Sequence, residues 1–263
     1  MRPMRGTERR RWRCAAVLLA LPLAASAADP APAPLTIGRQ VEPSLVADST
    51  ERLLTIAFER AKVPVVFKRL PLARSVEMAN DGEIDGDLGR IAEVGAQYPN
   101  IVSVPTPVNW LDSAVCGADP ALRTMTRAEV RKLRVVYARG TLALMRYTEG
   151  MASIESSTRD AGIEMVLNRR VDITVAAYTD VQPRLQDGSL RGLTLWPCAW
   201  ATGNLYLALN RRHAALVPRL DAVLQQMQHE GLIEREHEGA LRQARLPPLK
   251  TGDCGSDERP APR

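Results

Sequence analysis

A helix, a tight turn and a strand between residues 70 and 90 constrain the fold most strongly. Apolar side chains recur at helical spacing from Leu72 to Ala79. Asn80-Asp81-Gly82 then gives a stop signal, because Asn and Gly tolerate the left-handed conformation that ends helices. Ile84–Leu88 follows as a strand. Ligands of open α/β sheets bind beyond the carboxyl ends of strands, so Arg90 stands where a ligand would be met.

A second copy of this pattern lies further along the chain. Apolar residues share a helix face from Ile163 to Leu167, Asn168-Arg169-Arg170 ends the helix, and Val171–Tyr178 reads as a strand. Both copies run helix, Asn, polar residues, apolar-Asp, strand. Two such units predict two similar α/β lobes that face each other.

The elements before the first copy predict a parallel sheet. Leu35–Gly38 is a short strand, Asp48-Ser49-Thr50-Glu51 reads as a capped helix start, and Val63–Phe67 is a β-branched run. With the first copy this gives the order β-α-β-α-β, which is typical of parallel strands.

Two longer strands predict where the chain changes lobes. Trp110–Gly117 is the first crossing and Asn204–Leu209 is the return. We therefore expect the first lobe at 35–117 and 203–246, and the second at 118–202.

The formal charge of +5 comes from the first 27 residues, which hold six arginines against Glu8. The remaining chain has 29 basic and 29 acidic residues, so composition gives no case for nucleic acid binding.

These 27 residues predict a signal peptide. The Arg-rich start precedes an apolar run, Ala15–Ala25, and the small-residue site Ala25-Ser26-Ala27 predicts cleavage before Ala28. The alternative is an uncleaved membrane anchor. We expect an exported, periplasmic protein with a spacer at 28–34 and a disordered tail at 247–263.

Three cysteines follow the leader: Cys116, Cys198 and Cys254. We favour a Cys116–Cys198 disulfide, and buried or unpaired cysteines are the alternative. Their spacing fits no zinc site. The acidic run at 81–87 has Ala92 where a calcium loop needs its twelfth-position Glu, so we expect neither a metal nor another cofactor.

This order of elements resembles the extracytoplasmic solute-binding proteins of the amino-acid type, family 3, which serve ABC importers in bacterial periplasms. The matching stretches are Leu53–Arg90, Leu133–Thr141, Val171–Asp180 and Asn204–Gly231. The resemblance implies a periplasmic binding protein-like type II fold: two α/β lobes joined by two crossing strands. It also implies that the lobes close on a small-molecule ligand by a hinge motion. An ABC permease in the inner membrane is the implied partner, and we expect a monomer.

The chain departs from the family at two places. The loop Arg39–Ser44 lacks the aromatic residues that pack on the ligand, and Ile91–Gly95 lacks the arginine that clamps an amino acid's carboxylate. We therefore expect a small polar or anionic, amino-acid-like metabolite.

Arg90 is the first candidate for ligand binding, because a guanidinium matches a carboxylate with a planar fork. A surface arginine is the alternative. Thr141 precedes an expected helix whose free N–H groups attract anions, a role compatible with ordinary helix capping.

The other candidates are Tyr178 and Asp180, which end the second strand, together with Arg74 and Trp110. Asp180 suits an ammonium group or a helix N-cap. Arg74 either reaches the ligand or forms a surface ion pair, and Trp110 either stacks on the ligand or lies in the core.

The leading function is solute capture for import. The alternatives are a binding-protein-like sensor module that signals to a membrane partner and a dehydratase-type enzyme. The enzyme is the least favoured, because the chain has no G-x-S-x-G, paired Cys/His or H-E-x-x-H motif.

Overall fold

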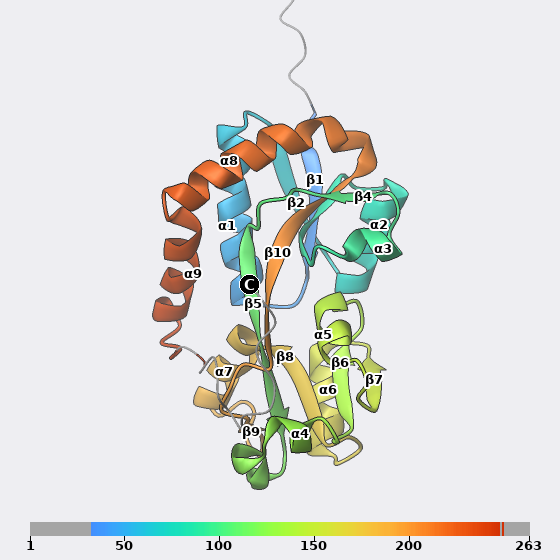
Figure 1. The fold of residues 1–263 in the computed structure, drawn as a ribbon, viewed down its shortest axis with the longest axis vertical. Helices are drawn as coiled ribbons and strands as arrows, with labels where there is room; N and C mark the ends of the chain where they lie inside the picture. The colour runs from blue at the N-terminus through green and yellow to red at the C-terminus, as the bar shows by residue number, and fades with distance from the viewer. Residues whose placement is uncertain (1–32, 248, 250–263) are drawn as a thin grey trace, which may run out of the picture. The chain divides into compact units, whose positions relative to one another are not determined.

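The computed structural model describes residues 33–247 and residue 249. The expected signal peptide, most of the spacer and nearly all of the tail lie outside this described part. Within it, two α/β lobes are joined by two long strands (Figure 1), as the sequence predicts. No helix in the described ranges combines the length and apolar character that crossing a bilayer requires.

The first lobe combines the start of the chain with its last helices. Its elements are β1 (Leu35–Gln40), α1 (Leu45–Arg60), β2 (Val65–Leu70), α2 (Leu72–Asp81), β3 (Gly86–Arg90), α3 (Val94–Gln97), β4 (Ile101–Ser103), the 3₁₀ segment Arg211–Leu216, α8 (Val217–His229) and α9 (Leu232–Gln243).

The second lobe comes from the middle of the chain. Its elements are the 3₁₀ segment Pro120–Thr124, α4 (Arg127–Val130), β6 (Val135–Ala138), α5 (Leu142–Tyr147), β7 (Ser153–Ser156), α6 (Arg159–Leu167), β8 (Ile173–Ala177), α7 (Tyr178–Gln186) and β9 (Thr194–Leu195). The crossing strands are β5 (Asn109–Gly117) and β10 (Ala201–Asn210).

Strand pairing runs in the order β2-β1-β3-β10-β5-β8-β6-β7. β1 is parallel to β2 and β3, and β6 is parallel to β7 and β8. β10 belongs to both lobes: residues 201–205 pair with β5, and residues 206–210 pair with β3 and β4. The strands therefore form one continuous path, and β10 is the element that connects the two lobes within it.

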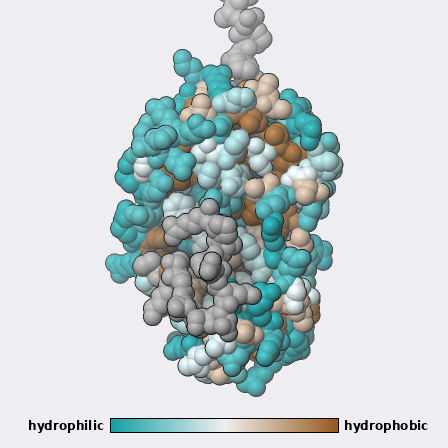
Figure 2. Space-filling view, viewed as in Figure 1, coloured by the Kyte–Doolittle hydropathy of each residue, from teal (hydrophilic) through white to brown (hydrophobic). Residues whose placement is uncertain are grey.

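Each lobe has its own hydrophobic core. In the first lobe, Leu53, Leu54 and Phe58 of α1 are fully buried against Leu220 and Leu224 of α8. Two buried clusters fill the second lobe, one of them around Trp196, Trp200 and Val115. Figure 2 shows a face that is mainly hydrophilic.

Several helix ends confirm the sequence signals. α2 stops at Gly82, which has a φ of 79°, and Gly231 separates α8 from α9 with a φ of 64°. Thr126 and Glu129 form a capping box at the start of α4.

Two predicted helix starts are wrong. α1 begins at Leu45 with Ser44 as its N-cap, because the Ser44 hydroxyl accepts a hydrogen bond from the Ala47 N–H and Val46 is buried. Asp48 therefore lies inside the helix. α7 begins at Tyr178 with Ala177 as its N-cap, so Asp180 lies in the first turn and does not cap the helix.

The favoured disulfide is also wrong. Cys116 is a free thiol in β5, fully buried in the second lobe. Cys198 is disulfide-bonded, so Cys116 is not its partner.

Candidate functional site

Arg90 ends β3 at the junction between the lobes and is only 4% exposed. Its guanidinium forms a bidentate pair with Asp87: Nε donates to Oδ1 at 2.8 Å and Nη2 donates to Oδ2 at 2.7 Å. Nη2 also donates to the Leu72 carbonyl at 2.8 Å, and Nη1 donates to the Gly140 carbonyl of the second lobe at 3.1 Å. The arginine expected to clamp a ligand therefore binds the protein itself.

Asp87 also accepts hydrogen bonds from groups other than Arg90. The Ser75 hydroxyl donates to Oδ2 at 2.5 Å and the Gly89 N–H donates to Oδ1 at 3.3 Å. A buried ion pair is stable only when further hydrogen bonds satisfy its remaining lone pairs and protons, and this pair has them.

Thr141 lies at the start of α5, but its hydroxyl donates back to the Ala138 carbonyl and forms no cap hydrogen bond. The helix is also only six residues long. Thr141 therefore stands at the N-cap position without its side chain capping the helix, and anion binding there stays a prediction.

Tyr178 is buried beneath the end of the described chain. Its hydroxyl donates to the Pro247 carbonyl at 2.7 Å, and the ring packs in the second lobe's core. Burial raises the pKa of Tyr178 to about 12, and Asp112 adds to the effect. Its contacts indicate a structural role.

Asp180, two residues further along α7, faces an arginine that sequence reasoning missed. Arg159 begins α6, and its Nη1 donates to Asp180 Oδ2 at 2.7 Å. Arg159 Nη2 reaches the Pro43 carbonyl of the first lobe at 3.3 Å. Burial raises the pKa of Asp180, whereas Arg159 and the nearby Ser44 and Thr179 hydroxyls act to lower it.

This group of polar side chains is incompletely satisfied. Four buried atoms in it have no hydrogen bond of good geometry among the described residues: Ser113 Oγ, Arg159 Nε, Thr179 Oγ1 and Asp180 Oδ1. Ser113 pairs with Ala177 in the β5–β8 ladder, which brings it beside the start of α7. We call Ser113, Arg159, Thr179 and Asp180 the junction cluster.

The junction cluster joins residues that no local pattern connects. Thr158-Arg159 at a helix start was one available signal, since Thr158 caps α6 through the Ala161 N–H. Nothing local marks Ser113, which lies inside a strand.

Two arginines thus donate across the junction in opposite directions. Arg90 of the first lobe reaches Gly140, and Arg159 of the second lobe reaches Pro43. A third contact joins Glu93 and Arg146 at 2.5 Å. That ion pair lies in a groove of about 400 Å³ lined by residues of both lobes: Ile91, Glu93, Ala96, Gln97, Leu142, Met145, Arg146 and Glu149.

The two remaining candidates lie elsewhere. Arg74 is about half exposed and pairs with Glu83 at 3.4 Å, a surface interaction. Trp110 stacks on His237 of α9 with ring centroids 3.8 Å apart. The structure therefore brings Asp180 into the junction cluster and Arg90 to the junction, while Tyr178, Arg74 and Trp110 have partners within the fold.

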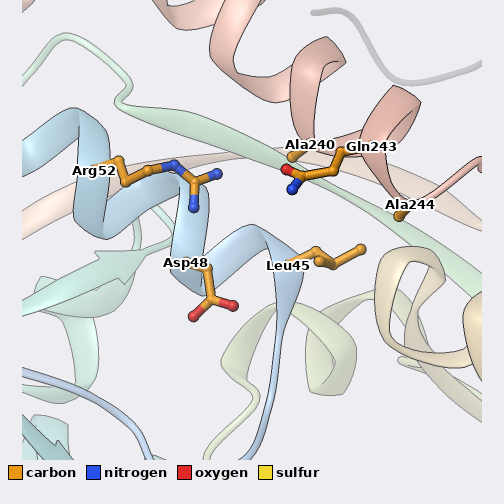
Figure 3. A pocket seen from close by; sticks show the side chains of 6 residues that line it. All are labelled: Leu45, Asp48, Arg52, Ala240, Gln243 and Ala244. Carbon is orange, nitrogen blue, oxygen red and sulfur yellow. The ribbon is translucent and has the colours of Figure 1, made fainter.

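A hollow of about 310 Å³ separates α1 from α9 (Figure 3). Arg52 and Gln243 point toward each other across it, and Asp48 points away. Arg52 already pairs with Glu236, and Asp48 with Arg39. These ion pairs indicate a groove between packed helices.

The acidic run from 81 to 87 has partners within the protein as well. Asp85 accepts from the Thr36 N–H at 2.7 Å and contacts Arg212 and His213, each at 2.6 Å. Among the described residues, no group of three or more His, Cys, Asp or Glu is placed to hold a metal ion.

Comparison with known proteins gives a remote relative and many structural neighbours. No protein-family model matches the chain. An uncharacterised protein of Shewanella oneidensis is 24% identical over 196 residues, which cover 70% of this chain and 73% of that protein.

The structural neighbours agree on the fold. The GluR0 ligand-binding core in complex with L-glutamate matches with a TM-score of 0.66 at 13% identity, covering 81% of this chain and all of that one. A histidine kinase sensor domain similar to periplasmic binding proteins matches with a TM-score of 0.65 at 14% identity, covering 79% of this chain and 96% of that one. An amino acid ABC transporter substrate-binding protein from Streptococcus pneumoniae, bound to L-arginine, matches with a TM-score of 0.61 at 11% identity. The match covers 82% of this chain and 97% of that one. The chain therefore has the type II periplasmic binding protein fold, the fold of amino-acid-type solute-binding proteins.

Proposed function

We propose that this protein is an exported solute-binding protein that captures a small polar metabolite between its lobes for ABC-type import. The observation that carries the proposal is the junction cluster. It places buried polar atoms without partners where two lobes meet, and buried polar groups ordinarily find hydrogen bonds. A solute held between the lobes would supply them.

The comparisons support ligand binding as the common property of this fold. The neighbours named above are a receptor core bound to glutamate, a sensor domain and a transporter component bound to arginine. These are binding proteins by their names, and we propose no enzymatic role for this chain.

The second candidate is a sensor module that reports a bound solute to a membrane partner. The similarity to a histidine kinase sensor domain favours it, since that match is as good as those to transporter components. Both candidates use the same binding step and differ in the partner.

A thermal-shift screen on the chain from Ala28 onward tests the binding step. The panel contains amino acids, carboxylates, amides and polyamines. A solute that binds only the folded protein should raise the unfolding midpoint as its concentration exceeds the Kd. Asp180→Ala should abolish the shift, and Arg74→Ala, an exposed arginine remote from the junction cluster, should keep it. A full panel without any shift would contradict the proposal.

Cross-linking in cells then separates the two candidates. Capture of a permease supports import, and capture of a sensor kinase supports signalling.

A further inference from the structure

The charged side chains at the lobe junction are compensated within the protein. Arg90 is neutralised by Asp87, and Asp180 by Arg159. Arg39, at the end of β1, is 3% exposed and binds both Asp48 and Glu51. Each of these charges therefore already has an opposite charge within the protein and needs none from a solute.

The Arg159–Asp180 pair is nevertheless incomplete in one respect. A guanidinium and a carboxylate often meet through two parallel hydrogen bonds. Here the single bond from Nη1 to Oδ2 leaves Nε as a donor and Oδ1 as an acceptor without a hydrogen bond of good geometry among the described residues. Asp160 Oδ1 is 3.9 Å from Arg159 Nε, too far for a hydrogen bond.

Two hydroxyls of the junction cluster are equally open, one next to Asp180 in α7 and one in β5 where it pairs with the end of β8. Ser113 Oγ and Thr179 Oγ1 have no partner of good geometry in the described part of the chain, and their residues are 0% and 6% exposed. The junction cluster therefore offers one donor, one acceptor and two groups that act as either, with its charges already balanced.

We propose that the solute group received by the junction cluster is uncharged and both donates and accepts, as a carboxamide or ureide does. This inference rests on the proposed function and specifies its ligand. An amide N–H₂ suits Asp180 Oδ1, and its carbonyl suits Arg159 Nε or a hydroxyl. An ammonium group would bring a second cation beside Arg159, and a carboxylate would bring a second anion beside Asp180. Each like-charge contact is costly in a buried site.

Isothermal titration with three probes of matched carbon length tests the inference: glutaramide, glutarate and 1,5-diaminopentane. On the chain from Ala28 onward, glutaramide should have the lowest Kd, by about tenfold or more over the charged probes. A lower Kd for glutarate or the diamine, or no binding of glutaramide, would overturn it.

Charge-neutralising variants sharpen the test. Asp180→Asn leaves Arg159 uncompensated, so glutarate should become the tightest probe. Arg159→Gln leaves Asp180 uncompensated, so 1,5-diaminopentane should become the tightest-binding probe for that variant. If both single variants kept the wild-type order of probe affinities, the assignment of an uncharged solute group to the junction cluster would be refuted.

Two double variants complete the design. Because a single change strands a buried charge and can impair folding, Arg159→Gln/Asp180→Asn removes both charges together and should keep glutaramide as the preferred probe. A preference for a charged probe in this variant would overturn the inference. The matched control is Arg134→Gln/Asp172→Asn, which neutralises an exposed Arg–Asp pair of the same lobe and should leave the order unchanged.

The thermal-shift screen separates this inference from the proposed function. If no solute in that panel stabilises the protein, solute binding itself fails. If a charged solute stabilises it while glutaramide ranks last, only the ligand class assigned here fails.

Discussion

Arg90 and Asp87, three positions apart in the sequence, form a buried ion pair. Both residues lie in β3, Asp87 near its start and Arg90 at its carboxyl end, and they are at most 4% exposed. Their hydrogen bonds reach α2, through Leu72 and Ser75, and the second lobe, through Gly140. The pair therefore fixes the end of β3 against its surroundings.

Arg90→Ala should lower the free energy of unfolding by about 3–5 kcal/mol, because it leaves Asp87 buried without its counter-charge. Urea denaturation of the unliganded protein measures this. Arg74→Ala, which removes an exposed ion pair, should cost less than about 1 kcal/mol. Equal losses in the two variants would show that the Arg90–Asp87 pair contributes no more than a surface contact.

Cys116 provides a second test at the residue scale. Burial raises the pKa of its thiol to about 12, and the thiolate is the reactive form. The native protein at pH 8 should therefore leave Cys116 unmodified by a thiol reagent such as DTNB, and denaturant should expose it. Cys116→Ser should reduce the thiols counted after denaturation by one. Rapid native labelling that Cys116→Ser removes would contradict the buried position.

Among the elements, α9 packs on the first crossing strand through a polar and aromatic contact. His237 of α9 stacks on Trp110, and its Nδ1 donates to Asn109 Oδ1 at 2.7 Å. Asn109 Nδ2 donates to the Ser49 and Thr50 hydroxyls of α1 at 2.9 Å each. This network joins α1, α9 and β5.

The network makes stability depend on pH. Burial lowers the pKa of His237 below its ordinary value of 6.5, and Asp112 and Glu238 partly oppose the shift. The unfolded chain therefore binds the proton more readily, so the free energy of unfolding should fall as the pH drops below about 6.5. The slope from this one group is at most about 1.4 kcal/mol per pH unit.

His237→Gln keeps a donor for Asn109 but does not titrate. Urea denaturation at pH 7.5 and pH 5.5 should show a smaller pH-dependent loss for this variant than for the wild type. Equal losses in both proteins would exclude His237 as the source.

Most elements could be predicted from the sequence, because their signals are local. Gly82 and Gly231 adopt the left-handed conformation that ends a helix, and apolar periodicity marks α8. The starts of α1 and α7 were missed for a tertiary reason. Val46 and Tyr178 are buried apolar residues, and their packing extends each helix ahead of the strongest capping pattern.

At the scale of the whole molecule, the lobes touch through a glycine that tolerates no side chain. Gly140 has a φ of 83°, and a Cβ there would lie 2.6 Å from the Ala73 backbone nitrogen of the first lobe. Its carbonyl accepts the hydrogen bond from Arg90. The close approach of α2 and the start of α5 therefore depends on this residue.

Gly140→Ala should push the lobes apart and raise the radius of gyration measured by small-angle X-ray scattering. Gly188→Ala is the matched control, since Gly188 has a φ of 79° but the heavy atom nearest to a Cβ there is Arg191 Nε, at 3.5 Å. The control should share the backbone strain and keep the wild-type radius. An unchanged radius in Gly140→Ala would show that the contact does not hold the lobes together.

The candidate site was less predictable than the fold, because its residues come together only in the complete folded molecule. The residues of the junction cluster come from three separate segments, which are β5, the start of α6 and the first turn of α7, and the sequence pattern marked Asp180 alone. Arg90 was placed correctly at the end of a strand, but only the folded structure shows that Asp87 pairs with its guanidinium.

The division of β10 between the lobes also sets the order in which the protein can be completed during synthesis. Residues 206–210, which pair with β3 and β4, leave the ribosome after the entire second lobe. Until then β3 and β4 lack this partner, and unpaired strand edges readily join other chains. The lobe that is started first is finished last, so the interval between β4 and β10 is when a nascent chain most needs protection from aggregation.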